Sequence, residues 1–206
     1  MPNNREDYLL VIWEFSESFG FARERDIVKR LKISAATASE YLKKMEDEGI
    51  ITRDGRRIRL TEKGEKLAIP VVRTHRIVEV FSHQLLETPW EDAHSSVMEL
   101  EHLFSDKKGE VLYRHLGEPD VCPHGNPINP IEKREEIKAS EAKPGVYIFL
   151  RTTYEDENFL RSLSEAGIIP GEEVEVRPDQ TIKGPRGILT SDARELDALR
   201  LIKKKS

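Results

Sequence analysis

A hairpin signal surrounded by basic residues constrains the fold most. Residues 50–61 read IITRDGRRIRLT, and Asp54-Gly55 separates two short strand-like runs. Asp-Gly suits the tight turn of a two-stranded antiparallel hairpin because both residues tolerate the positive φ that such a turn needs. The sequence therefore predicts a short hairpin that is rich in arginine.

Three amphipathic segments precede this hairpin. Apolar residues recur at helical spacing over residues 7–19 and again over residues 23–31. Ser34 is suited to cap a third helix, which ends at Gly49. Three helices followed by a basic hairpin predict a winged helix-turn-helix, a fold that binds DNA through its last helix.

The third helix and the hairpin supply the candidate DNA contacts. Exposed residues at the start of the last helix face the major groove, and basic side chains nearby contact the phosphate backbone. The groove candidates are Ala35, Ala36, Thr37, Ser39 and Glu40, and the backbone candidates are Lys43, Lys44, Arg53, Arg56, Arg57 and Arg59. The alternative is a solvated helix and turn within some other helical protein.

Charge is distributed unevenly along the chain. The net charge of −5 taken alone argues weakly against a nucleic-acid partner. Residues 21–66, however, hold 13 Lys and Arg against 9 Asp and Glu, whereas the rest of the chain holds 20 against 29. The sequence thus predicts a basic module joined to an acidic one.

Potential metal ligands recur at helical spacing after the hairpin. His75 and Glu79 are four residues apart on a long predicted helix, which Pro70 is expected to kink or break. A second helix is predicted over residues 90–116. It carries His94, Met98, Glu101 and His102. If the two helices pack together, the six donors exceed what one divalent ion needs, which predicts two neighbouring metal sites.

The chain is expected to form three domains. Residues 117–130 contain four prolines and indicate irregular structure, and short β-like runs from about residue 142 predict a small barrel with one helix near residues 158–165. The expected domains are a winged helix-turn-helix over 1–70, a helical dimerisation and metal-binding domain over 71–132, and the barrel over 140–206. The predicted fold is mainly α with a β-hairpin wing.

Location and assembly follow from general features of the sequence. It has no apolar run of about 18 residues and its first residues are charged, so neither a membrane span nor a signal peptide is predicted. A single cysteine, Cys122, fits a reducing compartment. We therefore expect a cytoplasmic protein without a membrane partner. Winged-helix regulators of this size usually bind DNA as twofold dimers, which predicts a homodimer on a pseudo-palindromic operator.

The ligand series, together with CPHGNPI at residues 122–128, resembles the diphtheria toxin repressor family of metal-dependent (iron or manganese) transcriptional regulators. The resemblance runs from the first helix through the proline-rich stretch, and more weakly through a C-terminal region similar to the SH3-like (FeoA-like) domain of that family. It implies a repressor of metal-homeostasis genes, not an enzyme, with Mn(II) or Fe(II) as corepressor. Co(II), Ni(II) and Zn(II) are expected to substitute in vitro.

The resemblance also implies a primary, regulatory site and an ancillary site. The primary site is similar to Asp7, Met98, Glu101 and His102. The ancillary site is similar to His75, Glu79 and His94, completed by Glu155 and Asn158, or alternatively by Cys122 and His124 of CPHG. A metal that also binds Asp7 would order the first helix and fix the separation of the DNA-binding helices. The metal itself stays open, because Asp7 resembles manganese responders and Met98 resembles iron responders.

Two other functions compete with this interpretation. A zinc metalloenzyme would use His75, Glu79 and His94 as ligands and Glu101 as a general base. The sequence, however, has no HExxH pair, phosphate-binding glycine loop or nucleophile elbow. The other alternative is a winged-helix regulator whose metal is structural, or which senses a different ligand through its barrel.

Overall fold

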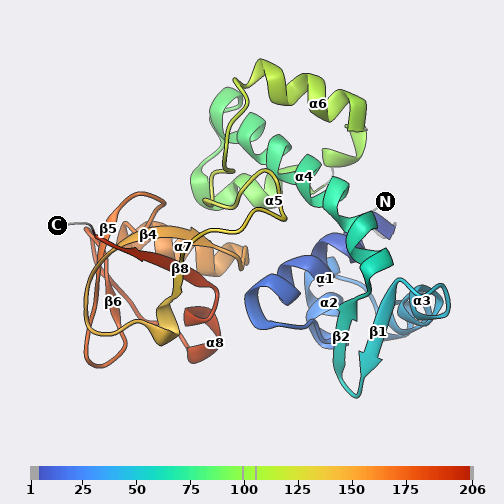
Figure 1. Ribbon diagram of the computed structural model, residues 1–206, viewed down its shortest axis with the longest axis horizontal. Helices are drawn as coiled ribbons and strands as arrows, with labels where there is room; N and C mark the ends of the chain where they lie inside the picture. The colour runs from blue at the N-terminus through green and yellow to red at the C-terminus, as the bar shows by residue number, and fades with distance from the viewer. Residues whose placement is uncertain (1–4, 99, 105, 205–206) are drawn as a thin grey trace. The chain divides into compact units, whose positions relative to one another are not determined.

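The computed structural model describes residues 5–98, 100–104 and 106–204 (Figure 1). The chain forms two compact units, residues 1–74 and residues 75–206. The fold is mixed α/β, with helices and a small hairpin first, a helical middle and a C-terminal antiparallel sheet. Among the helices that the structure describes, we find no candidate for a membrane span.

Three helices and a hairpin build the first unit, as the sequence predicts. The helices are α1 (Arg5–Phe19), α2 (Glu24–Leu31) and α3 (Ala35–Asp47). Strands β1 (Ile51–Asp54) and β2 (Arg57–Leu60) pair antiparallel around the predicted turn.

Local chemistry explains where α3 begins and ends. The Ser34 hydroxyl accepts a hydrogen bond of 3.0 Å from the Thr37 backbone N–H, which satisfies one of the free donors of the first turn. Gly49 follows the helix at φ +69°, a backbone conformation that glycine adopts without strain. Both positions were predicted from the sequence. The buried stripe of α3 consists of Ala38, Leu42 and Met45.

Helix α4 (Glu62–Leu85) begins in the first unit and ends in the second. It runs through Pro70 without interruption, so the break that was one of the two expectations for this residue is absent, and the kink stays a prediction. Proline removes one backbone donor, and the remaining hydrogen bonds of this long helix keep it continuous. As a result, His75 and Glu79 lie one turn apart on a single helix.

The prediction of a single helix over residues 90–116 is wrong. The structure has four short elements there: η1 (Trp90–Asp92), α5 (Ala93–Val97), η2 (Glu101–Leu103) and α6 (Asp106–His115). The hydroxyls of Ser95 and Ser96 donate to carbonyls three residues back, at 3.1 and 2.8 Å, and such bonds compete with helix propagation. Phe104 is extended, which separates η2 from α6. The potential ligands therefore lie on a short helix, a turn and a 3₁₀ turn.

Six antiparallel strands form the C-terminal sheet, in the order β3-β8-β4-β5-β6-β7. Their bounds are Ile137–Lys138 (β3), Gly145–Thr152 (β4), Glu173–Val176 (β5), Ile182–Lys183 (β6), Ile188–Leu189 (β7) and Leu199–Lys203 (β8). The described strands show no pairing between β3 and β7. Closure of the predicted barrel is therefore not demonstrated and stays a prediction.

Helix α7 (Glu157–Ala166) packs against this sheet (Figure 1). Its bounds are close to the range of residues 158–165 predicted from the sequence. The Asp156 carboxylate caps it by accepting hydrogen bonds from the backbone N–H groups of the first turn. Phe149 of β4 and Leu160 of α7 are fully buried in the shared core. The 3₁₀ turn η3 (Ala139–Glu141) and the short helix α8 (Ala193–Leu196) complete the second unit.

The proline-rich stretch is an ordered loop that joins the middle helices to the sheet. The Cys122 N–H donates to the Asn126 carbonyl at 2.8 Å, and the Asn126 side chain donates to the Thr152 carbonyl at 2.8 Å. The Thr152 N–H donates back to the His124 carbonyl at 3.1 Å. These bonds fix Cys122 and His124 relative to the end of β4.

Gly125 is expected to be essential to this loop. Its φ is +84°, and an added Cβ would lie 2.2 Å from the Leu150 carbonyl oxygen. Gly171 has a similar φ of +96° but open space around the Cβ position, so it is a matched control. Gly125→Ala should lower the free energy of unfolding by about 1–3 kcal/mol more than Gly171→Ala, measured by chemical denaturation with a chelator present. Equal effects of the two substitutions would contradict the proposed close contact.

Candidate metal centre

Buried imidazoles and carboxylates from four segments meet in the second unit. His75 and Glu79 come from α4, His94 from α5, His124 from the loop of residues 120–128, and Glu155 from the turn before α7. Each of these five residues is at most 5% exposed. Ionisable groups this deeply buried require partners of opposite charge or a metal.

The Glu79 carboxylate lies at the middle of this cluster. Its Oε1 atom is 3.0 Å from His75 Nε2, 3.3 Å from His94 Nδ1 and 3.4 Å from His124 Nδ1. Ligand atoms of one divalent ion lie about 3 Å apart, because each is about 2.1 Å from the metal. The spacing of these side chains is thus compatible with a shared ion.

Glu155 makes a second link between the same histidines. Its Oε2 atom is 2.7 Å from His94 Nδ1, and its Oε1 atom is 3.6 Å from His124 Nδ1. The Asn126 side-chain amide donates a hydrogen bond of 2.6 Å from Nδ2 to Glu155 Oε1, and Arg151 donates to Asn126 Oδ1 at 2.9 Å. Glu155 is therefore held in place by its neighbours.

Cys122 completes one side of the cluster. Its sulfur and ligand atoms of Glu79, His124 and Glu155 all lie within 4.8 Å of one another. Burial raises the pKa of the Cys122 thiol well above its ordinary value, and the nearby carboxylates of Glu79 and Glu155 raise it further. The free thiol is therefore protonated, and a bound cation would favour the thiolate.

The ionisable groups compensate one another. Burial alone would lower the pKa of His75, but the carboxylates of Glu101 and Glu79 outweigh it and raise that pKa well above its usual range. The pKa of His124 is raised in the same way by Glu155 and Glu79. Burial would raise the pKa of Glu79, yet His124 and His75 hold it well below its usual value. Without a metal, the protonated imidazolium groups therefore balance the negative charge of the carboxylates.

The donor set fits a divalent metal. Among the residues that the structure describes, Glu79 Oε2 is buried without a hydrogen-bond partner, and His124 Nδ1 has only its two long carboxylate contacts. Such atoms are rare in folded proteins unless an ion or water completes them. The other ring nitrogen of His124 donates to the Trp90 carbonyl at 3.1 Å. That bond leaves Nδ1 directed at the carboxylates, as in many histidines that ligate metals.

The remaining predicted ligands differ in burial. Glu101 is buried and forms a hydrogen bond with His75 Nδ1, whereas Met98 and His102 are partly exposed in the turn and the 3₁₀ turn after α5. Asp7 is buried in α1 of the first unit. Asn158 is exposed on α7.

Sequence reasoning did not identify the contacts that orient the ligands. Asn126 lies within the CPHGNPI motif, so its position offered a signal, but its bond to Glu155 joins segments 29 residues apart. The bond between His75 and Glu101 likewise became evident only from the structure. Both are contacts between distant segments, which helical spacing does not report.

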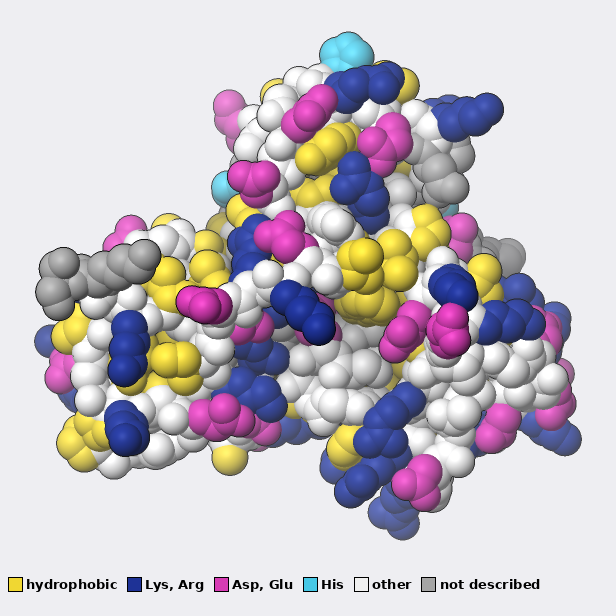
Figure 2. Space-filling view, in the orientation of Figure 1, with side chains coloured by type: hydrophobic (Ala, Val, Ile, Leu, Met, Phe, Trp, Pro, Cys, Tyr) yellow, Lys and Arg dark blue, Asp and Glu magenta, His cyan; other side chains and the backbone are white. Residues whose placement is uncertain are grey.

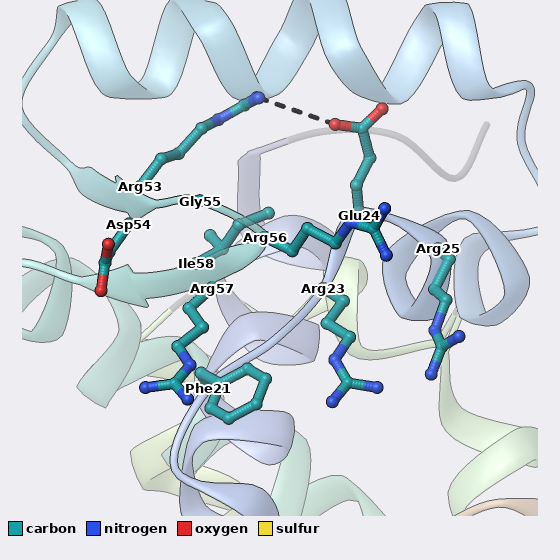
Figure 3. Close-up of a pocket in the computed structure, with 10 residues that line it drawn as sticks. All are labelled: Phe21, Arg23, Glu24, Arg25, Arg53, Asp54, Gly55, Arg56, Arg57 and Ile58. Atoms are coloured by element: carbon teal, nitrogen blue, oxygen red, sulfur yellow. Dashed lines mark ion pairs between the residues drawn. The ribbon is translucent and has the colours of Figure 1, made fainter.

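The first unit presents a basic surface (Figure 2). Lys and Arg side chains gather at the end of this unit that carries the hairpin. All the predicted groove residues of α3 are exposed, as are Lys43 and Lys44. An open cavity of about 800 Å³ lies between the hairpin and the start of α2 (Figure 3). Its lining includes Phe21, Arg23, Arg25, Arg56 and Arg57.

Comparisons with known proteins agree with both sets of observations. Residues 2–57 match the family model "Iron dependent repressor, N-terminal DNA binding domain", and residues 61–130 match "Iron dependent repressor, metal binding and dimerisation domain". The iron-dependent repressor IdeR of Mycobacterium tuberculosis is 30% identical over 194 residues, which cover 85% of this chain and 84% of that protein. Diphtheria toxin repressors of Corynebacterium species also match.

Solved structures give the same result. The crystal structure of IdeR from T. acidophilum superimposes with a TM-score of 0.90 over 99% of this chain and 100% of that chain, and its identity of 22% supports the fold alone. The structure of the manganese regulator SloR has a TM-score of 0.82 and 28% identity, over 99% of this chain and 100% of that chain. The predicted resemblance is confirmed: this chain belongs to the family of iron-dependent repressors that includes the diphtheria toxin repressors, a family of metal-dependent transcriptional repressors rather than enzymes.

Proposed function

We propose that Mn(II) or Fe(II) is the corepressor of this repressor and binds at a primary and an ancillary centre in each chain. The observation that carries the proposal is the buried cluster around Glu79, where three imidazole nitrogens lie within 3.4 Å of one carboxylate oxygen. Such a group of buried charges is costly unless its members are fully paired. A divalent cation would replace the protons that now balance the cluster.

The ancillary centre is proposed to be a single carboxylate-bridged centre rather than a choice between two ligand sets. His75 and His94 supply donors on one side, and Cys122 and His124 supply donors on the other. Glu79 contacts histidines of both sides, and Glu155 contacts His94 and His124. The two carboxylates can therefore serve two neighbouring ions.

The primary centre is proposed to use Asp7, Met98, Glu101 and His102. Glu101 is hydrogen-bonded to His75, which couples it to the ancillary cluster. An ion that binds Asp7 together with residues 98–102 would stabilise only the conformation in which α1 is fixed. The free energy for the switch is the difference in metal affinity between the two conformations.

The choice between manganese and iron rests on donor chemistry. The oxygen donors of Asp7 and Glu101 favour Mn(II) or Fe(II), whereas the thioether of Met98 favours softer ions. Similar proteins are described as iron-dependent repressors and as manganese regulators. We infer that either ion activates this chain, and that Co(II), Ni(II) and Zn(II) replace it in vitro because later metals bind such donors more tightly.

DNA binding is proposed to use a homodimer on a pseudo-palindromic operator. The exposed start of α3 would enter the major groove, and the hairpin would act as the wing. A groove of about 460 Å³ on the second unit is the proposed dimer contact. Its lining combines the apolar side chains of Phe104, Val111 and Leu112 with Lys107, Lys108 and His115. Within this scheme residues 1–70 bind DNA, residues 71–132 bind metal and dimerise, and residues 140–206 form an SH3-like domain that completes the ancillary centre.

Asp7→Ala is expected to uncouple metal from DNA. The variant should keep its fold and dimer state. Its gain in operator affinity on addition of Mn(II) should be about ten-fold or more smaller than that of the unaltered protein, a difference of about 1.4 kcal/mol in coupling free energy. Fluorescence anisotropy with a promoter duplex, with Mn(II) and with chelator, measures this increase. Glu6→Ala, an exposed acidic neighbour, should respond normally. A full metal response in Asp7→Ala would refute the coupling, and metal-independent binding by the unaltered protein would favour a structural metal.

The bridged ancillary centre predicts how metal stoichiometry changes. His75→Ala with His94→Ala removes donors from one side, and Cys122→Ser with His124→Ala removes them from the other. Each pair should therefore reduce bound Mn(II) by about one ion per chain, and the two pairs combined should reduce it by about two. Metal content after dialysis, measured by mass spectrometry, provides the count. Asn158→Ala, at an exposed position, should bind as many ions as the unaltered protein. A mononuclear centre would instead lose the same single ion in both double variants and in their combination.

The hairpin is expected to contact phosphates. Arg56→Ala with Arg57→Ala should weaken binding to operator and unrelated duplexes alike, and should reduce the slope of log affinity against log salt by about two. Titrations between low and moderate salt measure the slope. An unchanged slope would exclude the hairpin from the DNA interface.

A further inference from the structure

One aromatic side chain in the first unit gathers three arginines around it. The guanidinium carbons of Arg23, Arg57 and Arg59 lie 5.2, 5.1 and 5.7 Å from the centroid of the Phe21 ring. We call these four residues the Phe21 cluster. Figure 3 shows the Phe21 ring between Arg57 and Arg23, with both guanidinium groups extending to the same side. Neither the metal centres nor the groove contacts of α3 account for this arrangement.

The backbone holds the Phe21 cluster together. Phe21 and Arg23 lie on the connection between α1 and α2, whereas Arg57 and Arg59 lie on β2. Between these residues, Ala22 and Ile58 exchange two backbone hydrogen bonds, each of 2.9 Å. The Arg59 side chain adds a hydrogen bond of 3.0 Å from its Nε to the Gly20 carbonyl. The connection and the hairpin therefore form one rigid base for the cluster.

The positive charge of this surface is only partly neutralised. Arg53 is paired, at 3.6 Å from Glu24 and 3.5 Å from Glu46. Arg59 is held by the Gly20 carbonyl. In contrast, Arg23, Arg56 and Arg57 have no ion pair with any residue that the structure describes. The cavity beside the hairpin therefore keeps an excess of positive charge.

This arrangement suits an anion with several oxygen atoms. A cation–π contact between each guanidinium group and the ring is favourable, which helps to hold the guanidinium groups together against their repulsion. A guanidinium that lies against a ring keeps its N–H groups available for phosphate oxygens. An anion placed between Arg23 and Arg57 would relieve the repulsion that the free protein retains.

We propose that Phe21 is a positioning residue, which holds Arg23 and Arg57 ready for a backbone phosphate of DNA beside the hairpin. This inference rests on the proposed DNA-binding function and adds two residues, Phe21 and Arg23, that the helix-turn-helix pattern did not indicate. The contact is to phosphate, so it contributes affinity for all sequences and no preference among them.

Substitutions at Phe21 separate its ring from its bulk. Phe21→Leu removes the ring but keeps an apolar side chain, and it should lower affinity for operator and unrelated duplexes by the same factor, roughly five-fold or more. Phe21→Tyr keeps the aromatic face and should stay within about two-fold of the unaltered protein. The slope against salt should change little in either variant because all the charges remain.

Arg23→Ala tests the charge directly. It should weaken binding to every duplex and reduce the salt slope by about one. Lys66→Ala, which removes the same charge from α4, is the control and should leave the slope unchanged. Lys66 is paired with Glu62 at 2.6 Å on an exposed face.

The outcomes separate this proposal from the proposed function. Affinities are measured by anisotropy with saturating Mn(II), and thermal unfolding confirms that each variant is folded. Normal DNA affinity in folded Phe21→Leu, or an unchanged salt slope in Arg23→Ala, would overturn the proposal. A third result would also overturn it: inorganic phosphate stabilises the protein more than chloride does at equal ionic strength, and Arg23→Ala abolishes this effect without affecting DNA binding. The Phe21 cluster would then be a site for a free anion. The manganese concentration for half-maximal binding should stay the same in all variants; a repressor that ignores manganese would refute the proposed function but not the phosphate contact.

Discussion

The buried carboxylate of Glu79 is the constraint on which the second unit depends. A carboxylate that is fully excluded from water is strongly destabilising unless positive charge surrounds it. His75, His94 and His124 supply that charge from three different segments, each within 3.4 Å of the same oxygen. The second unit is therefore stable only if α4, α5 and the loop of residues 120–128 bring these side chains together. The same requirement makes the cluster a place where a divalent cation can replace protons.

The surrounding structure keeps the ligands aligned without direct contact to a metal. Asn126 and Arg151 fix Glu155 from the side of the sheet, and the hydrogen bond to the Trp90 carbonyl fixes the ring orientation of His124. Much of this support comes from the end of β4 and the turn before α7. The C-terminal sheet thus has a structural reason to be part of the same unit as α4, since Glu155, just after β4, contacts His94 and His124.

The sequence predicted elements with strong local signals and missed those that depend on distant partners. Ser34, Gly49 and Asp54-Gly55 each act on neighbouring residues, so α3 and the hairpin were predicted with nearly correct bounds. The helix over residues 90–116 was wrong because helical spacing of apolar residues and ligands does not register the competing hydrogen bonds of Ser95 and Ser96. Strand β8 was not singled out from the sequence, because what makes it a strand is its pairing with β3 and β4 rather than its own composition. Glu155 was identified through family resemblance, since nothing in its local sequence marks it as a ligand.

The two units treat charge in opposite ways. Around Glu79, imidazolium and carboxylate groups are buried together, so negative charge is compensated inside the protein. Around Phe21, guanidinium groups are held at the surface by an aromatic ring, and Arg23 and Arg57 have no carboxylate partner among the described residues. Under the two proposals, each arrangement would gain stability on binding an ion of opposite charge, a divalent cation in the first case and a phosphate in the second. Binding of either ligand is therefore favoured by charges that the free protein balances only with protons or not at all.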